Sequence, residues 1–225
     1  MNRAIIIMTK VPLAGNVKTR LQPFLSPEEC AALAEAFLLD TASKAEAFCE
    51  NVVAAFYPPS EIEKLKLILT DRFGLVAQSG DELGARMFNA FDFAFGNDSD
   101  SVVMIGTDSP TFPASFIAQA FEFLESDSDV VLGKTADGGF YLIGLRVLQK
   151  EIFENVCWSS PQTFEQTRGN VINLKLRLSE TPEWYDVDTP SDFARLQNEF
   201  SIDENARRRA PQTFELLNEK ENQMR

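Results

Sequence analysis

Acidic side chains follow predicted strands at two places that lie far apart in this chain of 225 residues. Asp108 comes soon after the apolar run at 102–105, and Asp188 lies 80 residues further on, just before Thr189 and Pro190. If both strands end at one edge of a sheet, the two carboxylates can hold one divalent cation, and oxygen ligands suit Mg²⁺ or Mn²⁺. Each acid also has a plainer explanation, because Asp108 can be a turn residue and Asp188 can cap a helix.

A basic loop follows the first apolar run at 4–8 and carries Lys10, Gly15, Lys18 and Arg20. An arginine can bind phosphate oxygens through two parallel hydrogen bonds, a lysine acts as a point charge, and a glycine lets the backbone approach a ligand closely. We therefore predict a phosphate-binding loop, in which Lys18 is also a catalytic candidate. The spacing of a Walker A motif is absent from the sequence, and the alternative is an ordinary solvated loop.

Two further stretches offer groups to an acceptor. Gly138 and Gly139 would admit a sugar or another acceptor close to the backbone, and Asp137 would accept hydrogen bonds from its hydroxyl groups. Asp137 is also the candidate general base, and Trp158 is a candidate wall of the acceptor site. The alternatives are a simple hairpin turn at 137–139 and a partly buried tryptophan.

Gly80 and Arg86 belong to a fourth stretch, at 80–87, that directly precedes a predicted helix. The amino end of a helix favours anions, so we predict that both residues bind the nucleotide. Plain helix capping explains the same pattern.

The composition excludes several kinds of chemistry. The chain has no histidine, which excludes Ser-His-Asp and Cys-His machinery and the usual histidine-bearing zinc sites. General-base work then falls to Asp, Glu, Lys, Tyr or water. A net charge of -13 argues against duplex nucleic acid and against anionic lipid as partners.

The three cysteines are scattered and show no metal-ligand spacing, which is typical of small buried residues in a reducing compartment. The first eight residues are too few for a signal peptide, and no apolar run is long enough to span a bilayer. We expect a cytoplasmic protein. The sequence does not determine the oligomeric state, and a homo-oligomer is one possibility.

Alternation of apolar runs with helical patterns predicts an α/β fold in which a mainly parallel central sheet is flanked by helices on both faces. The sequence predicts a single domain over 1–200 and a charged tail over 201–225, for which a solvated helix is expected and anion binding by its three consecutive arginines is the alternative. Strands are expected at 4–8, 51–56, 75–78, 102–105, 129–133, 140–145 and 171–178. Helices are expected at 27–48, 61–66, 82–95 and 113–125, and from 160 and 189 onward.

Four segments together resemble a known group of proteins. They read MTKVPLAGNVKTRL at 8–21, GTDSP at 106–110, DGGFYLIGL at 137–145 and DVDTP at 186–190. In this order they resemble a bacterial family of glycosyltransferase-A type known as nucleotide-diphospho-sugar transferase-like proteins. The chain is also similar to the guanylyltransferases that activate phospholactate and, more remotely, to molybdopterin nucleotidyltransferases. The resemblance covers about residues 4 to 198.

The resemblance implies a single-domain, Rossmann-like GT-A fold that needs Mg²⁺ or Mn²⁺ and transfers a group from a nucleotide-linked donor. By position, Lys18 and Arg20 match its phosphate-binding loop, and Asp108 and Asp188 match its two metal-side acids. One departure lies at 80–87, where Glu82 separates the expected Asp from Leu-Gly and Ala85 replaces an acid. The resemblance therefore does not extend to base recognition by that loop.

The sequence thus predicts a metal-dependent transferase whose partners are a nucleotide or nucleotide-sugar and a small-molecule acceptor. Glycosyl transfer from an NDP-sugar is the first hypothesis. Nucleotidyl transfer, in which an acceptor phosphate attacks an NTP and pyrophosphate leaves, is the alternative, because the Lys18 and Arg20 pair suits a triphosphate. A non-catalytic nucleotide sensor is a third hypothesis, since one fold hosts many functions.

Overall fold

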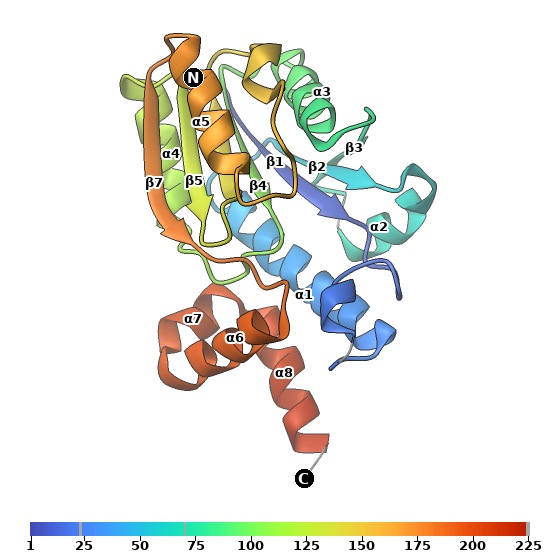
Figure 1. Ribbon diagram of the computed structural model, residues 1–225. Coiled ribbons are helices and arrows are strands. Elements are labelled where there is room, and N and C mark those ends of the chain that lie inside the picture. The colour runs from blue at the N-terminus through green and yellow to red at the C-terminus, as the bar shows by residue number, and fades with distance from the viewer. Residues whose placement is uncertain (23, 70, 224–225) are drawn as a thin grey trace.

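A computed structural model describes residues 1–22, 24–69 and 71–223. It contains one seven-stranded sheet in the order β3-β2-β1-β4-β6-β5-β7 (Figure 1). Its strands are β1 Arg3–Lys10, β2 Val52–Tyr57, β3 Gly74–Ala77, β4 Ser101–Gly106, β5 Val130–Thr135, β6 Phe140–Leu145 and β7 Leu178–Trp184. Only β6 pairs in the antiparallel sense with its neighbours β4 and β5, so the other strands all run in one direction. The predicted fold class is confirmed.

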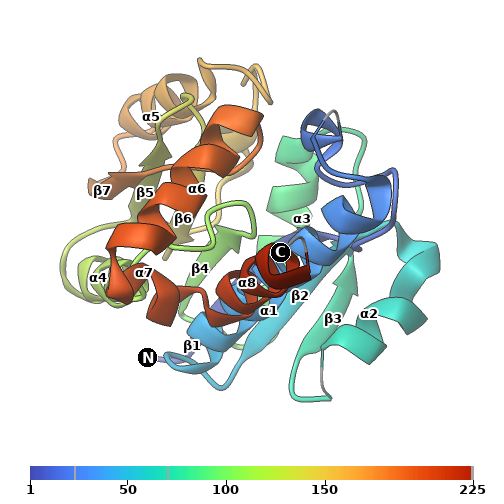
Figure 2. The same ribbon diagram turned by 90° about the horizontal axis from the view of Figure 1, so that it is seen from below.

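Helices cover both faces of this sheet, and a further group lies beyond the carboxyl ends of its strands (Figures 1 and 2). The helices are α1 Pro27–Glu46, α2 Ile62–Ile68, α3 Leu83–Phe95, α4 Ser115–Ser126, α5 Thr163–Asn173, α6 Pro190–Ile202, α7 Glu204–Arg209 and α8 Pro211–Gln223. In the described part of the chain, each helix lacks either the length or the apolar character needed to cross a membrane.

Alternation along the central strands divides the core between the two faces. In β1, Ile5 and Ile7 pack with α1, α2 and α4, whereas Ala4 and Ile6 pack with α3 and α5. Because successive side chains of a strand point to opposite faces, a strand with only apolar residues must be covered on both. This is why the runs at 4–8 and 102–105 identify the two central strands.

The chain between 171 and 178 differs from the prediction of a strand there. Val171 is buried in the last turns of α5, and strand β7 begins only at Leu178. The apolar residues at 171–178 fit helical spacing and strand alternation equally loosely. Strand β7 contains Pro182, which an edge strand tolerates. β7 lies at the edge of the sheet, beside β5.

The charged tail also differs from the expected solvated helix. Helix α6 continues to Ile202, and α7 and α8 then pack back, with Ala206 and Ala210 fully buried in a third core cluster that includes Phe37 of α1. The backbone N–H groups of Gln212 and Thr213 donate to the carboxylate of Asp40, which caps α8. Figure 2 shows α8 lying across α1.

Candidate active site

Every predicted site loop that follows a strand of the parallel set lies at the same edge of the sheet. Lys10 ends β1, Asp108 follows β4, and Asp186 and Asp188 follow β7. The turn at 137–139 follows β5 and leads into β6. The carboxyl ends of parallel strands form the usual ligand-binding edge of an open α/β sheet, so the fold gathers these groups where chemistry is expected.

Asp108 and Asp188, the two predicted metal-side acids, meet at the ammonium group of Lys18. The Nζ atom donates to Oδ1 of Asp108, to Oδ1 of Asp188 at 3.0 Å and to the carbonyl oxygen of Val187 at 2.9 Å. An ammonium has three N–H donors, so protein acceptors engage all of them. The structure therefore brings the three residues together, with the lysine at the centre.

The local fold turns Lys18 inward. Val17 and Leu21 are buried on either side of it, and its own backbone is left-handed, with φ 49°. Its side chain is only 5% exposed and its Nζ lies 5.1 Å from the ring centre of Phe37. A non-glycine residue in this backbone region is strained, and such strain gathers at functional sites.

Electrostatics keeps this group charged. Burial opposes the positive charge of Lys18, but Asp108 and Asp188 outweigh it and hold the pKa of the ammonium above its ordinary value. A third acid, Asp186, is half-buried beside them and accepts a hydrogen bond from Ser109. Burial of its carboxyl group, assisted by the charges of Asp108 and Asp188, raises the pKa of Asp186 to about 7.

The two carboxylates offer oxygen donors of the kind that a divalent ion takes. No group of three or more His, Cys, Asp or Glu side chains within residues 1–22, 24–69 and 71–223 forms a metal cage. Mg²⁺, however, usually takes one or two carboxylates and completes its shell with water and substrate phosphates. The side chains of Asp108 and Asp188 are 50% and 37% exposed, so their carboxylates reach solvent from one place.

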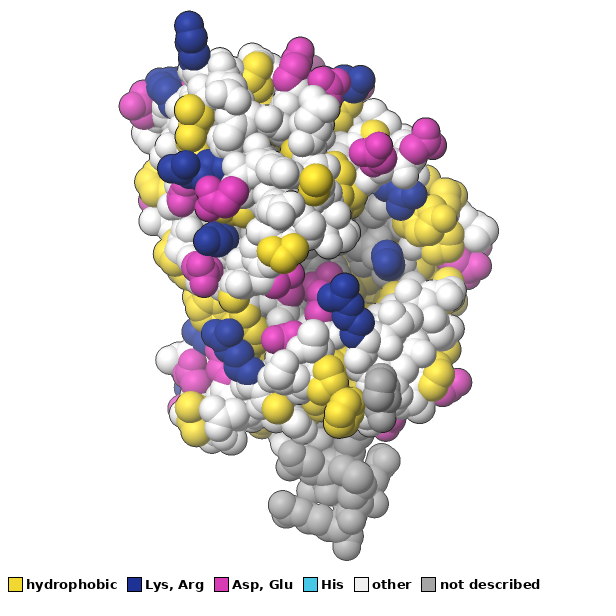
Figure 3. Space-filling model, viewed as in Figure 1, with side chains coloured by type: hydrophobic (Ala, Val, Ile, Leu, Met, Phe, Trp, Pro, Cys, Tyr) yellow, Lys and Arg dark blue, Asp and Glu magenta, His cyan; other side chains and the backbone are white. Residues whose placement is uncertain are grey.

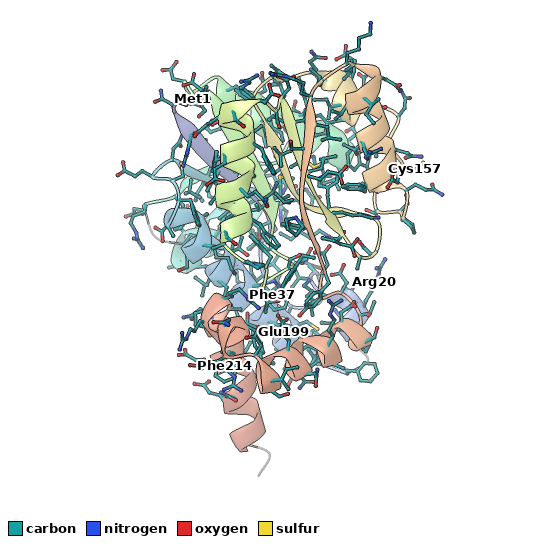
Figure 4. All side chains as sticks on the ribbon, turned by 90° about the vertical axis from the view of Figure 1, so that its left-hand side faces the viewer. Met1, Arg20, Phe37, Cys157, Glu199 and Phe214 are labelled. Atoms are coloured by element: carbon teal, nitrogen blue, oxygen red, sulfur yellow. The ribbon has the colours of Figure 1, made fainter. Side chains whose placement is uncertain are left out.

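The remaining basic-loop residues face outward. Lys10, Gly15 and Arg20 are exposed, and Gly15 has a positive φ of 83° with open space within 4 Å of where a Cβ atom would stand. Figure 4 shows Arg20 at the periphery, at the level of the carboxyl edge. In Figure 3, acidic and basic side chains gather at the centre of one face beside a hollow. Phosphate binding by this loop stays a prediction.

Gly80 and Arg86 are brought together by one hydrogen bond. Nε of Arg86 donates to the carbonyl oxygen of Gly80 at 3.0 Å, and the guanidinium group lies 4.7 Å from the ring centre of Tyr57 at the end of β2. Gly80 has φ 120°, which explains the glycine. Their binding of a nucleotide stays a prediction.

The turn at 137–139 is tightly built. Oδ1 of Asp137 accepts from the hydroxyl of Thr135 at 2.6 Å and from the N–H of Gly139 at 3.0 Å. Gly138 has φ 92°, and a side chain there would lie 2.2 Å from the carbonyl oxygen of Pro161. The turn geometry accounts for all three residues, and their acceptor role stays a prediction.

Trp158 connects the acceptor side to the stretch at 80–87. Its ring packs edge-on against Phe140 with centroids 6.3 Å apart, and it lies so close to Gly84 that a side chain there would be 2.7 Å away. Among the described residues, no hydrogen bond or ion pair links Trp158, Asp137 or Arg86 to Asp108.

The sequence places Asp186 with Asp188 in the loop after the last predicted strand, and the structure has it beside the two acids. Sequence reasoning missed one residue that bonds to both acid-bearing segments. Glu199, on α6, carries no local motif, and only the fold places it near the acid-bearing loops.

Solved structures resemble this chain in fold. A protein of Desulfovibrio desulfuricans G20, provisionally named a nucleotide-diphospho-sugar transferase, superposes with a TM-score of 0.90 and 29% identity over 99% of this chain and 96% of its own. A cytidylyltransferase of Leptospira borgpetersenii serovar Hardjo-bovis strain JB197 gives a TM-score of 0.58 and 17% identity over 99% and 96%. A Mycobacterium tuberculosis H37Rv protein in complex with manganese gives 0.52 and 14% over 88% and 99%.

One family model also matches, over residues 39–160, which is more than half of the chain. It is described as "Uncharacterized protein conserved in bacteria (DUF2064)". No curated protein matches the sequence. The fold match together with the family match confirms the resemblance stated from the four segments.

Proposed function

The chain belongs to the bacterial DUF2064 family, and we propose that it is a metal-dependent transferase that acts on a nucleotide-activated donor. The observation that carries the proposal is the meeting of Asp108, Asp188 and Lys18 at the carboxyl edge of the sheet. The names of the structural neighbours, a nucleotide-diphospho-sugar transferase and a cytidylyltransferase, support the enzyme class.

In this proposal the donor's phosphates lie across the acid side of the edge. Asp108 and Asp188 would hold a Mg²⁺ or Mn²⁺ ion, and the bound ion would offset the negative charge of the leaving group. Lys18 holds the two carboxylates in register and limits their mutual repulsion. Arg20, with its exposed side chain, binds phosphate oxygens from the rim, together with Lys10 and the backbone at Gly15.

The acceptor lies on the side of the turn at 137–139 and Trp158. Asp137 would accept a proton from the acceptor, because it is the carboxylate of the turn that we assign to the acceptor side. Gly80 and Arg86 would contact the nucleotide from the other side. Positioning and charge neutralisation would supply most of the rate enhancement.

Glycosyl transfer from an NDP-sugar is the first candidate, favoured by the name of the neighbour that shares 29% identity. Nucleotidyl transfer is the second, favoured by the likeness to a cytidylyltransferase. The two differ in product, since an NDP leaves in the first and pyrophosphate leaves in the second.

Exchange of labelled pyrophosphate into each NTP with Mg²⁺ or Mn²⁺ separates these candidates. Exchange would assign nucleotidyl transfer, whereas NDP release from a panel of NDP-sugars would assign glycosyl transfer. Nucleotide binding without product from either panel would favour a sensor.

The metal role is tested by thermal shift with Mn²⁺ and nucleotide. We expect Asp108→Asn to abolish the shift, and Asp127→Asn to retain it, because Asp127 pairs with Arg177 and is 86% exposed. An equal shift in the wild type and Asp108→Asn would contradict the proposal.

A further inference from the structure

One carboxylate outside the proposed site joins the two segments that carry its acids. Oε2 of Glu199 accepts a hydrogen bond from the hydroxyl of Thr111 at 2.9 Å and another from the hydroxyl of Tyr185. Thr111 lies three residues after Asp108, and Tyr185 lies three residues before Asp188. A single group on α6 thus holds both acid-bearing segments.

The same two segments are tied to each other directly. The N–H of Val187 donates to the carbonyl oxygen of Asp108 at 2.8 Å, and Nε1 of Trp184 donates to the hydroxyl oxygen of Thr111 at 3.3 Å. Trp184 and Val187 lie on either side of Tyr185 along the chain, and Thr111 takes part in both the Trp184 and the Glu199 bonds. A change in the position of Glu199 would therefore be transmitted to the relative placement of the acids.

An arginine of α7 pairs with the negative charge of Glu199. Its Oε1 accepts from Nη2 of Arg209 at 3.1 Å, and Arg209 also pairs with Asp203 at 3.0 Å. Thr111 is fully buried and Tyr185 is 4% exposed, so each hydroxyl needs a protein acceptor. Burial and the bond to Glu199 hold the pKa of Tyr185 well above its ordinary value, so the phenol stays a donor.

We infer that Glu199 is a positioning residue that fixes Asp108 and Asp188 relative to each other, and that α6 and α7 act on the site through it. Figure 4 shows Glu199 among the lower helices, beyond the carboxyl edge and near Phe37. The positioning stands on the contacts above, whereas its effect on metal binding rests on the proposed function.

A merely structural role would have a different signature. If Glu199 only attached α6 to the domain, its loss would lower the protection of all core amides together, in proportion to global stability. If it aligns the two segments, the amide of Val187 should lose protection selectively, because that amide makes the bond to Asp108.

Amide hydrogen exchange followed by NMR tests this in the full chain without any ligand. Glu199→Leu removes the acceptor at similar size, and we expect Val187 to exchange about tenfold faster relative to the β4 amides. Glu199→Gln should restore part of the protection, since its amide oxygen still accepts. The matched control is Glu204→Leu, which breaks an exposed pair with Arg208 and should leave Val187 unchanged.

Val187 protection that is unchanged, or that falls only in parallel with β4, would overturn the inference. Should Glu199→Leu fail to fold, Tyr185→Phe and Thr111→Val each remove one hydroxyl donor, and we expect about threefold faster exchange from each. The effects of Tyr185→Phe and Glu199→Gln should add to less than their sum, because both act on the bond between Tyr185 and Glu199.

A second arm measures Mn²⁺ affinity by electron paramagnetic resonance. If both proposals hold, Glu199→Gln weakens Mn²⁺ binding about tenfold while Glu204→Leu does not. Selective exchange at Val187 in a protein that binds no Mn²⁺ would overturn the proposed function and leave the positioning role intact. If the wild type binds Mn²⁺ and Val187 exchange is unchanged in the variants, the positioning role is overturned and the proposed function is left intact.

Discussion

The two sides of the carboxyl edge are built in different ways. On the acid side, Lys18 is 5% exposed and holds Asp108 and Asp188, while Asp186 lies half-buried beside them. In the loop around this centre, Gly15 and Arg20 are exposed, and the space around Gly15 is open. The charged centre is thus preorganised, whereas the surrounding loop is left open to a ligand.

A physical reason explains this division. Buried or half-buried charges are costly unless they are paired, so the acid side must be satisfied by the protein itself before any ligand arrives. Exposed loop groups are solvated by water and need no partner. Preorganised charge is also what catalysis by electrostatic stabilisation requires.

The largest expected effect comes from replacing the cation at the centre of the acid side. Lys18→Met leaves two carboxylates facing each other, and we expect kcat/KM of the transfer reaction to fall about 100-fold. Lys66→Met is the control, since Lys66 pairs with the exposed Glu63 on α2. Activity of Lys18→Met within about threefold of the wild type, by steady-state kinetics, would contradict the central role of this lysine.

The next effect distinguishes the closely packed turn at 137–139 from the open loop around Gly15. Gly138→Ala places a side chain 2.2 Å from the carbonyl oxygen of Pro161, and we expect it to cost about 2 kcal/mol of unfolding free energy. Gly15→Ala meets nothing within 4 Å and should cost about 1 kcal/mol, through its positive φ alone. Urea unfolding measures both, and equal costs would remove the distinction.

Arg20 tests the open side without disturbing the fold. Because its side chain is exposed, Arg20→Ala should leave thermal stability unchanged. If Arg20 binds donor phosphates, KM for the donor should rise about tenfold with little change in kcat. An unchanged KM would place the phosphates elsewhere.

The smallest effect concerns a buried lysine behind the acid side. Lys44 donates to the carbonyl oxygen of Pro110, and burial lowers its pKa to about 8. Between that value and the ordinary value of 10.5, the unfolded chain binds more protons than the folded one, so stability rises with pH in this window.

We expect the wild type to gain about 1 kcal/mol relative to Lys44→Met between roughly pH 7.5 and 9. Chemical denaturation of both proteins across this range measures the gain. Parallel stability curves for the two would show that Lys44 does not titrate differently on folding.

The sequence predicted the parts of the fold that have a local cause. Continuous apolar runs marked β1 and β4, and a serine cap with Pro27 and Glu29 marked the start of α1, where the capping box is present. The stretch at 171–178 was mispredicted because a helix end and a strand start share it. Its edge strand contains few apolar residues, so periodicity gave little help.

The sequence predicted that the candidate site residues meet because it predicted a parallel sheet. Asp108 and Asp188 each follow a strand, and parallel strands bring their carboxyl ends to one edge. That Lys18 would lie between them had no local signal, because the left-handed turn at Lys18 involves neither glycine nor asparagine. Glu199 and Lys44 act from helices whose placement only tertiary packing determines.

The bond between the amide of Val187 and the carbonyl of Asp108 also bears on how the protein is made. Strands β1 and β4 and Asp108 are synthesised before the segment that bonds to Asp108 and before Glu199, which secures that segment. Contacts of such high sequence separation form late. A nascent chain can therefore pair β1 with β4 well before Asp108 and Asp188 come together.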